Sequence, residues 1–189
     1  MMDRPWAMNL GSIGMIMAHE MTHALDIQGS LYDFKGDLRN WWSESARKTF
    51  TDKSQCFVNQ YNSYRFPEQN MTVNGSLTLG ENIADNGGIR EAYRALKAYQ
   101  KQRSGQFERL PGKMDQFDEE QLFFISFANM WCSNNLPNAV KKTLESGAHP
   151  PESVRVDGSL ANFDKFSDAF HCKPGSKMFR QPEERCILW

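Results

Sequence analysis

Apolar residues recur at helical spacing along most of the sequence, which predicts a mainly helical protein. The first predicted helix spans residues 12–27, with Ser12 as its N-cap and Gly29 as a stop signal just beyond its end. A turn-rich link over residues 33–40 follows it. Residues 41–64 then predict a long amphipathic helix. Its apolar positions are Trp42, Ala46, Phe50, Phe57, Tyr61 and Tyr64.

The second half of the chain continues this helical pattern. Residues 79–102 predict a helix that contains Gly87-Gly88, a costly placement that indicates close packing against a neighbouring element. Residues 119–132 predict a strongly apolar helix. The remaining segments are a loop over 67–76, a linker over 104–115, a short helix over 138–145, and forty final residues, rich in proline and glycine, with short helical pieces. We expect at most a few short strands.

The composition is that of an ordinary globular domain. The 189 residues are 40% hydrophobic and 24% charged, which is enough to bury a core in one domain or a large piece of one. The net charge of -1, without long runs of one sign, argues against nucleic acid or an anionic membrane surface as partner. Small molecules or peptides are the expected partners.

The opening residues do not predict a membrane anchor or a cleaved signal. No stretch approaches the roughly 18 consecutive apolar residues of a membrane span. Residues 1–18 are mildly apolar, but they contain Asp3, Pro5 and Asn9 and lead directly into His19. We therefore interpret them as mature protein, and expect no membrane contact by this segment.

The cysteines and glycosylation motifs bear on the cellular compartment. Cys56, Cys132, Cys172 and Cys186 lie too far apart for a zinc knuckle, and a set of buried thiols in a cytosolic protein is one interpretation of them. Two N-glycosylation motifs, at Asn70 and Asn74, lie in a polar stretch that predicts a surface loop. These motifs favour a secreted protein slightly.

Residues 19–23 have the pattern H-E-x-x-H. On a helix, residues four apart share a face, so His19 and His23 can bind one metal ion. Glu20 lies one residue on, where its carboxylate can reach a zinc-bound water. Zinc lowers the pKa of that water toward neutrality, and a carboxylate base then removes its proton as it attacks a peptide carbonyl. The pattern therefore predicts a metallopeptidase.

A catalytic zinc is held by three protein ligands and keeps one open position. His149, His171 and Glu81 are the candidates for the third ligand. Glu81 and Asp85 are four apart at the start of a predicted helix and share a face. One of them can bind the metal while the other accepts a hydrogen bond from a ligand imidazole. On the residues alone, two exposed acids on a helix surface remain an alternative.

Five segments together resemble the neprilysin and endothelin-converting-enzyme family. They are H-E-M-T-H-A-L-D from residue 19, K-G-D-L-R-N-W-W from 35, L-G-E-N-I-A-D-N-G-G from 79, Q-L-F-F-I-S-F-A-N-M-W-C from 121, and the Cys-x-x-x-Trp end at 186–189. The resemblance runs in order along almost the whole chain. It implies the C-terminal catalytic portion of a gluzincin, or thermolysin-like, fold, mainly α with few short strands.

The resemblance also implies roles for individual residues. It makes His19, His23 and Glu81 the ligands of one Zn²⁺ per chain, Glu20 the general base, and Asp85 the acid that orients a ligand histidine, His19 in the family arrangement. His149 falls where the family histidine stabilises the tetrahedral oxyanion, and Arg155 where the family arginine binds the substrate carbonyl. Four residues match the pocket for the hydrophobic residue after the scissile bond: Met15, Ile16, Met130 and Trp131. For these four, plain core packing is the alternative.

The resemblance further implies a Cys56–Cys186 disulfide, with the partners of Cys132 and Cys172 in an upstream part that this chain lacks. Family members are ectoenzymes with a membrane anchor and a large N-terminal lobe. Residues 1–189 therefore predict the C-terminal zinc-binding part of such a catalytic domain, without that lobe and anchor, at the extracellular face of the plasma membrane or secreted.

Several positions depart from the family pattern, among them Pro150-Pro151 directly after His149, where the family usually has Ser-Pro. Gly147 stands where the family has an aspartate that orients the oxyanion histidine, and Ile187 stands where neprilysin has an arginine for a substrate's C-terminal carboxylate. We therefore expect a zinc endopeptidase that cleaves oligopeptides on the amino side of hydrophobic residues. The alternative is a truncated, catalytically impaired relative that acts as a zinc-containing binding module. A purely structural zinc site is disfavoured because such sites have four ligands rich in cysteine.

Overall fold

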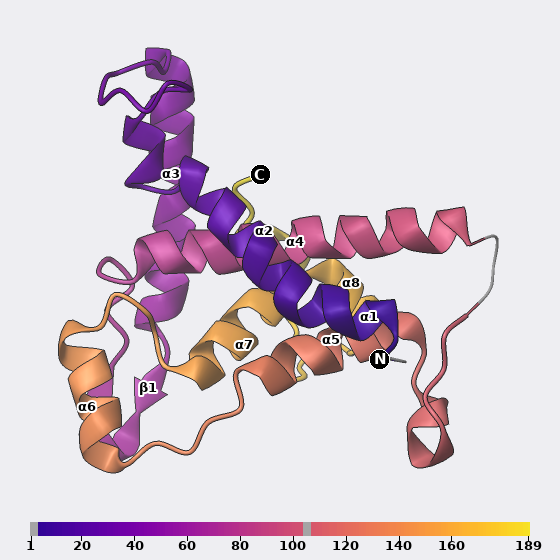
Figure 1. Cartoon of the computed structure of the whole chain (residues 1–189). Coiled ribbons are helices and arrows are strands. Elements are labelled where there is room, and N and C mark those ends of the chain that lie inside the picture. The colour runs from indigo at the N-terminus through magenta and orange to yellow at the C-terminus, as the bar shows by residue number, and fades with distance from the viewer. Residues whose placement is uncertain (1–3, 104–106) are drawn as a thin grey trace.

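The computed structural model describes residues 4–103 and 107–189, and its architecture is mainly helical (Figure 1). Eight α-helices and one two-stranded hairpin make up the regular structure of these residues. The helices are α1 Trp6–Asn9, α2 Met15–Thr22, α3 Glu44–Asn62, α4 Leu79–Gln102, α5 Glu119–Met130, α6 Pro137–Ser146, α7 Glu152–Ala161 and α8 Asp164–Ala169; the strands are β1 Arg65–Phe66 and β2 Met71–Thr72. No helix in the described part of the chain is long and apolar enough to cross a bilayer.

The first helix begins earlier than the sequence predicted. It starts at Trp6, and α1 and α2 are joined by a π-helical turn over Leu10–Gly14, so the predicted N-cap Ser12 lies inside the helix. The Ser12 hydroxyl donates to the Met8 carbonyl at 2.7 Å instead. The helix start is satisfied by the Glu108 carboxylate, which accepts the Trp6 N–H at 2.6 Å. Because Glu108 is so distant in sequence, no residue near Trp6 indicates that the helix begins there.

The same helix also ends before the predicted residue 27. A 3₁₀ turn over His23–Leu25 closes it, and Asp26 is already extended with ψ of -169°. Gly29, predicted as the stop, opens the next 3₁₀ turn, Gly29–Leu31. The prediction of a helix around the H-E-x-x-H motif is confirmed, and its boundaries were wrong at both ends.

The remaining helices follow the predicted pattern, with differences of a few residues. Helix α4 has the predicted bounds, and α6 extends the predicted range by one residue at each end. Helix α3 begins at Glu44 because the Ser43 hydroxyl caps it by accepting the Ala46 N–H at 3.2 Å. The predicted loop 67–76 contains β2, which pairs antiparallel with β1. Residues 104–106 of the predicted linker lie outside the described residues.

Helix α2 crosses α4 at backbone contact, which is the packing that Gly87-Gly88 predicted (Figure 1). A Cβ on Gly87 would lie 2.6 Å from Thr22 Cγ2, and one on Gly88 would lie 2.7 Å from the backbone nitrogen of His19. Side chains at these two positions would push the helices apart. The glycines thus place His19 of α2, and His23 directly after it, over the first turns of α4.

Two apolar clusters support this crossing from either side. One surrounds α5, where Phe123, Phe124 and Phe127 are fully buried against α1, α2 and the second half of α4. The other surrounds α3, where Phe57 and Tyr61 pack against Ile83 of α4. Helix α3 stands across the end of α4, as Figure 1 shows. The crossing therefore lies between the two cores, with the core around α3 against the first turns of α4 and the core around α5 against its second half.

Candidate metal centre

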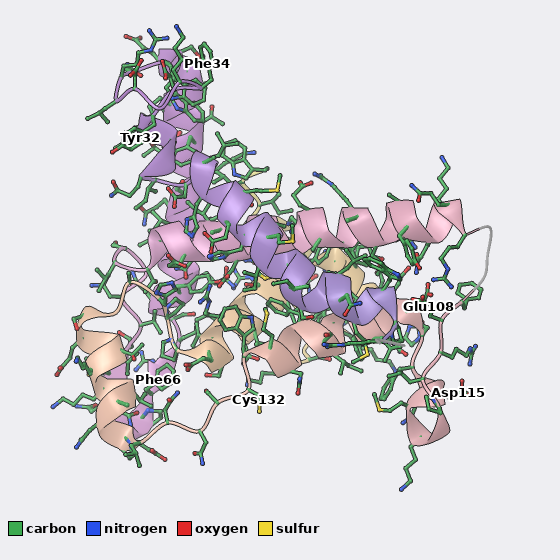
Figure 2. The ribbon with its side chains drawn as sticks, viewed as in Figure 1. Tyr32, Phe34, Phe66, Glu108, Asp115 and Cys132 are labelled. Atoms are coloured by element: carbon green, nitrogen blue, oxygen red, sulfur yellow. A yellow bond between two sulfur atoms is a disulfide. The ribbon has the colours of Figure 1, made fainter. Side chains whose placement is uncertain are left out.

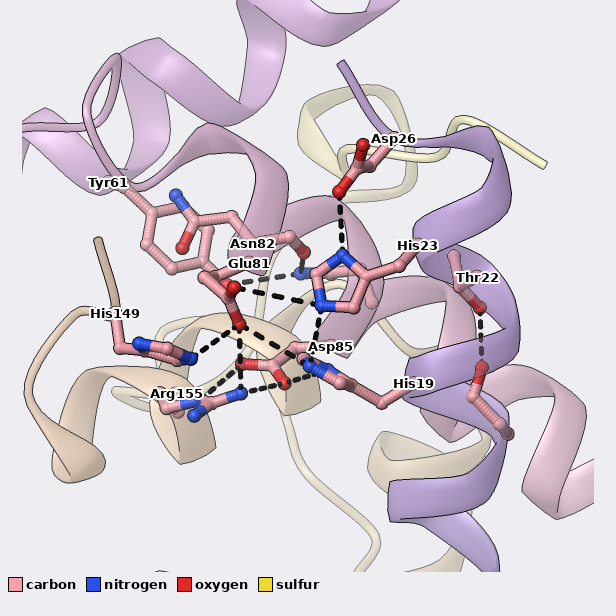
Figure 3. A network of polar contacts seen from close by, with 12 residues as sticks. His19, Thr22, His23, Asp26, Tyr61, Glu81, Asn82, Asp85, His149 and Arg155 are labelled. Carbon is pink, nitrogen blue, oxygen red and sulfur yellow. Dashed lines mark hydrogen bonds and ion pairs between the residues drawn. The ribbon is translucent and has the colours of Figure 1, made fainter. Parts of the chain in front are cut away.

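Three side chains converge at the helix crossing: His19 of α2, His23 of the 3₁₀ turn that follows it, and Glu81 of α4 (Figure 3). His19 Nε2 lies 3.0 Å from His23 Nε2 and 3.3 Å from Glu81 Oε2, and His23 Nε2 lies 3.6 Å from Glu81 Oε1. All three ligand atoms lie within 4.8 Å of one another. His171, also considered as a third ligand, is exposed and is not part of this group among the described residues.

These separations fit a zinc ion. Zinc binds nitrogen and oxygen at about 2.0–2.2 Å in tetrahedral geometry, so adjacent ligand atoms lie about 3.3 Å apart. The three measured distances scatter around that value. Glu81 Oε2 is buried and makes no well-aligned hydrogen bond among the described residues, although His149, His19 and Arg155 nitrogens lie within 3.6 Å of it. The residues present can therefore hold the metal.

The far nitrogens of both histidines face carboxylates. His19 Nδ1 lies 2.9 Å from Asp85 Oδ1, and His23 Nδ1 lies 2.6 Å from Asp26 Oδ2. A carboxylate at Nδ1 favours the tautomer with its proton there, which leaves the Nε2 lone pair for a metal. Two Nε2 lone pairs then face each other beside the Glu81 carboxylate. A proton or a metal ion between these atoms relieves the convergence of acceptors.

The electrostatics of the cluster agree with this interpretation. Burial lowers the pKa of His19, but hydrogen bonds and charge from Asp85 and Glu81 outweigh burial and raise that pKa to about 9. Burial also opposes ionisation of Glu81, yet His19, His149 and His23 together hold its pKa below its usual range. The centre therefore carries negative charge. This charge attracts a proton in the metal-free protein, and a metal ion where one is present.

Asp85 has a second partner besides His19. Arg155, from α7, donates through Nε and Nη2 to the two Asp85 oxygens at 2.8 and 2.7 Å. Its Nη2 also lies 3.6 Å from Glu81 Oε2. Asp85 is fully buried and Arg155 is 6% exposed, so the pair is shielded from solvent. This arrangement fixes the Asp85 carboxylate, and through it the His19 ring.

The sequence model of Peptidase family M13 matches residues 1–186. The chain belongs to peptidase family M13. Neprilysin-11 of Caenorhabditis elegans is 43% identical over 98% of this chain, and an endothelin-converting enzyme homolog of Locusta migratoria is 45% identical over 98%. The resemblance inferred from the motifs is thus confirmed.

This M13 chain spans only a fraction of those relatives. It covers 21% of the nematode protein and 24% of the locust protein. Among solved structures, the Mycobacterium tuberculosis zinc metalloprotease Zmp1 in complex with an inhibitor is similar over 97% of this chain and 28% of that chain. Its TM-score is 0.86 at 30% sequence identity. The fold is therefore that of M13 peptidases, mainly helical with few strands.

The residues predicted to act beside the metal lie at different depths. Glu20 is exposed on α2, on the turn that carries His19 and His23. His149 has a 59% exposed side chain, and its Nε2 lies 3.0 Å from Glu81 Oε2 (Figure 3). Gly147 gives His149 no carboxylate, and a Cβ there would lie 2.6 Å from the Thr143 carbonyl oxygen. The roles of Glu20 and His149 stay predictions.

The four predicted pocket residues are not equivalent in the structure. Met15 is fully buried in the core around α5, so it can support a pocket wall only from behind. Ile16, Met130 and Trp131 are partly exposed and pack against the same core. Trp131 also lies under the Arg155 guanidinium, 3.8 Å from ring centroid to Cζ. Their contact with substrate stays a prediction.

The cysteines and glycosylation motifs are placed as follows. Cys56 and Cys186 form a disulfide, the pair that the resemblance implied. Cys132 is an exposed thiol on the segment between α5 and α6 (Figure 2). Cys172 is a partly exposed thiol. Asn70 and Asn74 are both exposed beside the β1–β2 hairpin. The pairing of the two thiols and glycosylation of the two asparagines stay predictions.

Asp26 is the residue of the centre that the sequence analysis missed. It lies three residues after His23, beyond the helix, where helical spacing gives no reason to expect contact. Its Oδ1 accepts the Gln28 and Gly29 N–H groups at 2.7 Å each, which turns Oδ2 toward His23. An aspartate followed by a turn directly after a ligand histidine was the available signal.

Proposed function

We propose that this chain is the zinc-binding part of an M13 metalloendopeptidase that hydrolyses oligopeptides on the amino side of hydrophobic residues. The observation that carries the proposal is the convergence of His19, His23 and Glu81 at zinc-ligand spacing, with Glu20 on the same helix. The names of the relatives, among them neprilysins and an endothelin-converting enzyme homolog, support peptide substrates. The partly exposed Ile16, Met130 and Trp131 support a hydrophobic residue after the scissile bond.

In this proposal each side chain has one task. Zinc, when bound, polarises the peptide carbonyl and lowers the pKa of a coordinated water toward neutrality. Glu20 accepts the proton of the attacking water and later delivers it to the leaving amine. His149 donates a hydrogen bond to the developing oxyanion, and Arg155 donates one to the carbonyl of the bound peptide. Asp85 and Asp26 hold the rings of His19 and His23.

The test is cleavage of an internally quenched peptide with a central phenylalanine by the zinc-loaded chain and its Glu20→Gln variant. A positioned general base contributes about 10²–10⁴-fold, so Glu20→Gln should lower kcat/KM by that order while zinc content stays unchanged. Glu68→Gln, an exposed change on the β1–β2 hairpin, is the matched control and should cleave at the wild-type rate. Equal rates for wild type and Glu20→Gln would contradict the proposal.

A second candidate function, a zinc-containing binding module with impaired turnover, is favoured by one observation. Residue 147 is glycine, so the exposed His149 lacks the carboxylate expected to orient it. The same assay separates the two candidates, because a binding module would retain zinc and bind peptide without cleaving it.

The proposed setting is extracellular, at the cell surface or in secretion. The Cys56–Cys186 disulfide fits an oxidising compartment, and the exposed Asn70 and Asn74 are accessible to glycans. A shift in electrophoretic mobility on glycosidase treatment of protein secreted from eukaryotic cells would test the two asparagines.

A further inference from the structure

The closest contact between a cation and an aromatic ring in the described residues lies beside the metal centre. Arg155 Cζ is 3.8 Å from the centroid of the Trp131 ring, whereas the other such contacts span 4.8 to 5.9 Å. Trp131 follows the last residue of α5, and Arg155 lies within α7. The contact thus joins two helices at the point where both reach the centre.

The two sets of contacts on the Arg155 guanidinium constrain it in different directions. Its Nε and Nη2 groups donate to Asp85, and these two bonds fix the guanidinium group within its own plane. The indole of Trp131 covers a face of that plane and opposes tilting out of it. Because Arg155 is 6% exposed, little water competes at that face, and a desolvated cation–π contact is among the stronger ones.

The indole itself is held by packing and not by a hydrogen bond. Its Nε1 is buried and has no hydrogen-bond partner among the described residues. The ring packs against the core around α5, and its backbone N–H bonds to the Ala128 carbonyl at 3.2 Å at the end of that helix. Its position is therefore fixed independently of Arg155, as a support must be.

We infer that Trp131 is a positioning residue that acts through Arg155. Its indole face holds the guanidinium so that Nε and Nη2 stay on Asp85 while Nη1 remains for a substrate carbonyl. This role rests on the proposed peptidase function and differs from the predicted role of Trp131 as a pocket wall. A residue in a pocket wall contacts the substrate side chain, so its effect depends on which side chain the peptide carries. A support for Arg155 affects every peptide alike, because all peptides present the same carbonyl.

The test uses two peptides that differ only after the scissile bond, phenylalanine in one and alanine in the other. We expect Trp131→Leu to lower kcat/KM by about tenfold for both peptides, and Trp131→Phe to restore most of the loss. Met130→Leu keeps the volume of the neighbouring pocket residue and serves as the matched control. It should change the phenylalanine peptide alone, and by less than the tryptophan change.

A double-mutant cycle with Arg155→Met shows whether the effect passes through Arg155. In that background Trp131→Leu should change kcat/KM by less than about twofold, because the supported group is gone. The inference is overturned if Trp131→Leu acts on the phenylalanine peptide alone, or acts equally with and without Arg155.

A zinc-loaded wild type that cleaves neither peptide would count against the proposed function. The support of Arg155 by Trp131 would then be tested by a second measurement, thermal stability. In thermal unfolding, the double variant should then lose less in Tm than the sum of the two single variants. Fully additive losses would overturn the inference.

Discussion

Helix α4 carries a cluster of buried charge at each end, and the two clusters differ in how their hydrogen-bonding groups are matched. At the first turns, Glu81 meets the Nε2 atoms of His19 and His23, and its buried Oε2 makes no well-aligned hydrogen bond among the described residues. At the last turn, the buried Glu119 of α5 accepts three donors: the Arg103 guanidinium at 2.8 Å, the Gln100 amide at 2.9 Å and the Glu108 N–H at 2.8 Å.

The difference shows how a structural carboxylate is distinguished from a metal ligand. Both carboxylates are ionised in the fold, since neighbouring groups hold the pKa of Glu119 and of Glu81 below the usual range against the effect of burial. Glu119 is satisfied by the protein itself and needs no ligand. Glu81 Oε2 is left without a well-aligned hydrogen bond among the described residues, and a bound cation would complete its surroundings. Burial and charge alone do not separate the two cases.

The largest effect that would sharpen this contrast is on zinc content. Glu81→Ala should reduce zinc from about one per chain to well below one, with affinity reduced by more than about 100-fold, because a ligand is lost. Mass spectrometry of the purified native chain after dialysis measures this. Glu119→Gln is the matched control. Glu119 belongs to α5 and contacts the other end of α4, so this change should leave zinc near one per chain. Loss of zinc in both variants would break the comparison.

An intermediate effect is expected at Asp26. Asp26→Ala should weaken zinc binding by about 10–100-fold, because His23 loses the carboxylate that orients its ring. Competition with a chromophoric chelator measures the affinity.

Asp33→Ala provides the control for Asp26. Asp33 also accepts two backbone N–H groups in a turn, from Lys35 and Asp37, but contacts no histidine ligand among the described residues. If both variants weakened zinc binding equally, the effect would come from turn stability and not from orientation of His23.

The smallest effect is expected from Glu119→Gln on stability. The variant should lower the free energy of unfolding by about 1–3 kcal/mol, since it removes a charged acceptor from buried donors. Urea unfolding with zinc in excess measures it.

The pH dependence of this loss identifies its cause. Because the folded pKa of Glu119 lies below its ordinary value, its contribution is fully present above that ordinary value and is lost as pH falls through the lower folded pKa. The stability difference between wild type and Glu119→Gln should therefore shrink in acid. A difference that is constant with pH would point to lost packing instead.

The sequence predicted those parts of the molecule that depend on local spacing. The two histidines share a face because they are four residues apart on a helix, and α4 has the bounds that its apolar pattern predicted. Gly87-Gly88 indicated the close crossing. The assignment of Glu81 as third ligand needed more than spacing, since His149 and His171 were equally open on the residues alone.

The features that escaped prediction depend on contacts between residues far apart in sequence or outside a helix. The first helix begins at Trp6 because Glu108 caps it, and the π-helical turn over Leu10–Gly14 shifts the helical phase that periodicity relies on. Asp26 reaches His23 only because the helix has already ended. Trp131 matched a pocket position, yet its place under Arg155 is a contact between residues 24 positions apart, one just after α5 and the other within α7.

The Cys56–Cys186 disulfide divides the chain into a covalent ring and an open arm. The ring, closed across 130 positions, contains Glu81, Asp85 and Arg155, whereas His19 and His23 lie on the arm that precedes it. One proteolytic cut within the ring leaves all fragments joined. One cut between His23 and Cys56 yields two separate pieces, and the metal would then be a bridge that both pieces share.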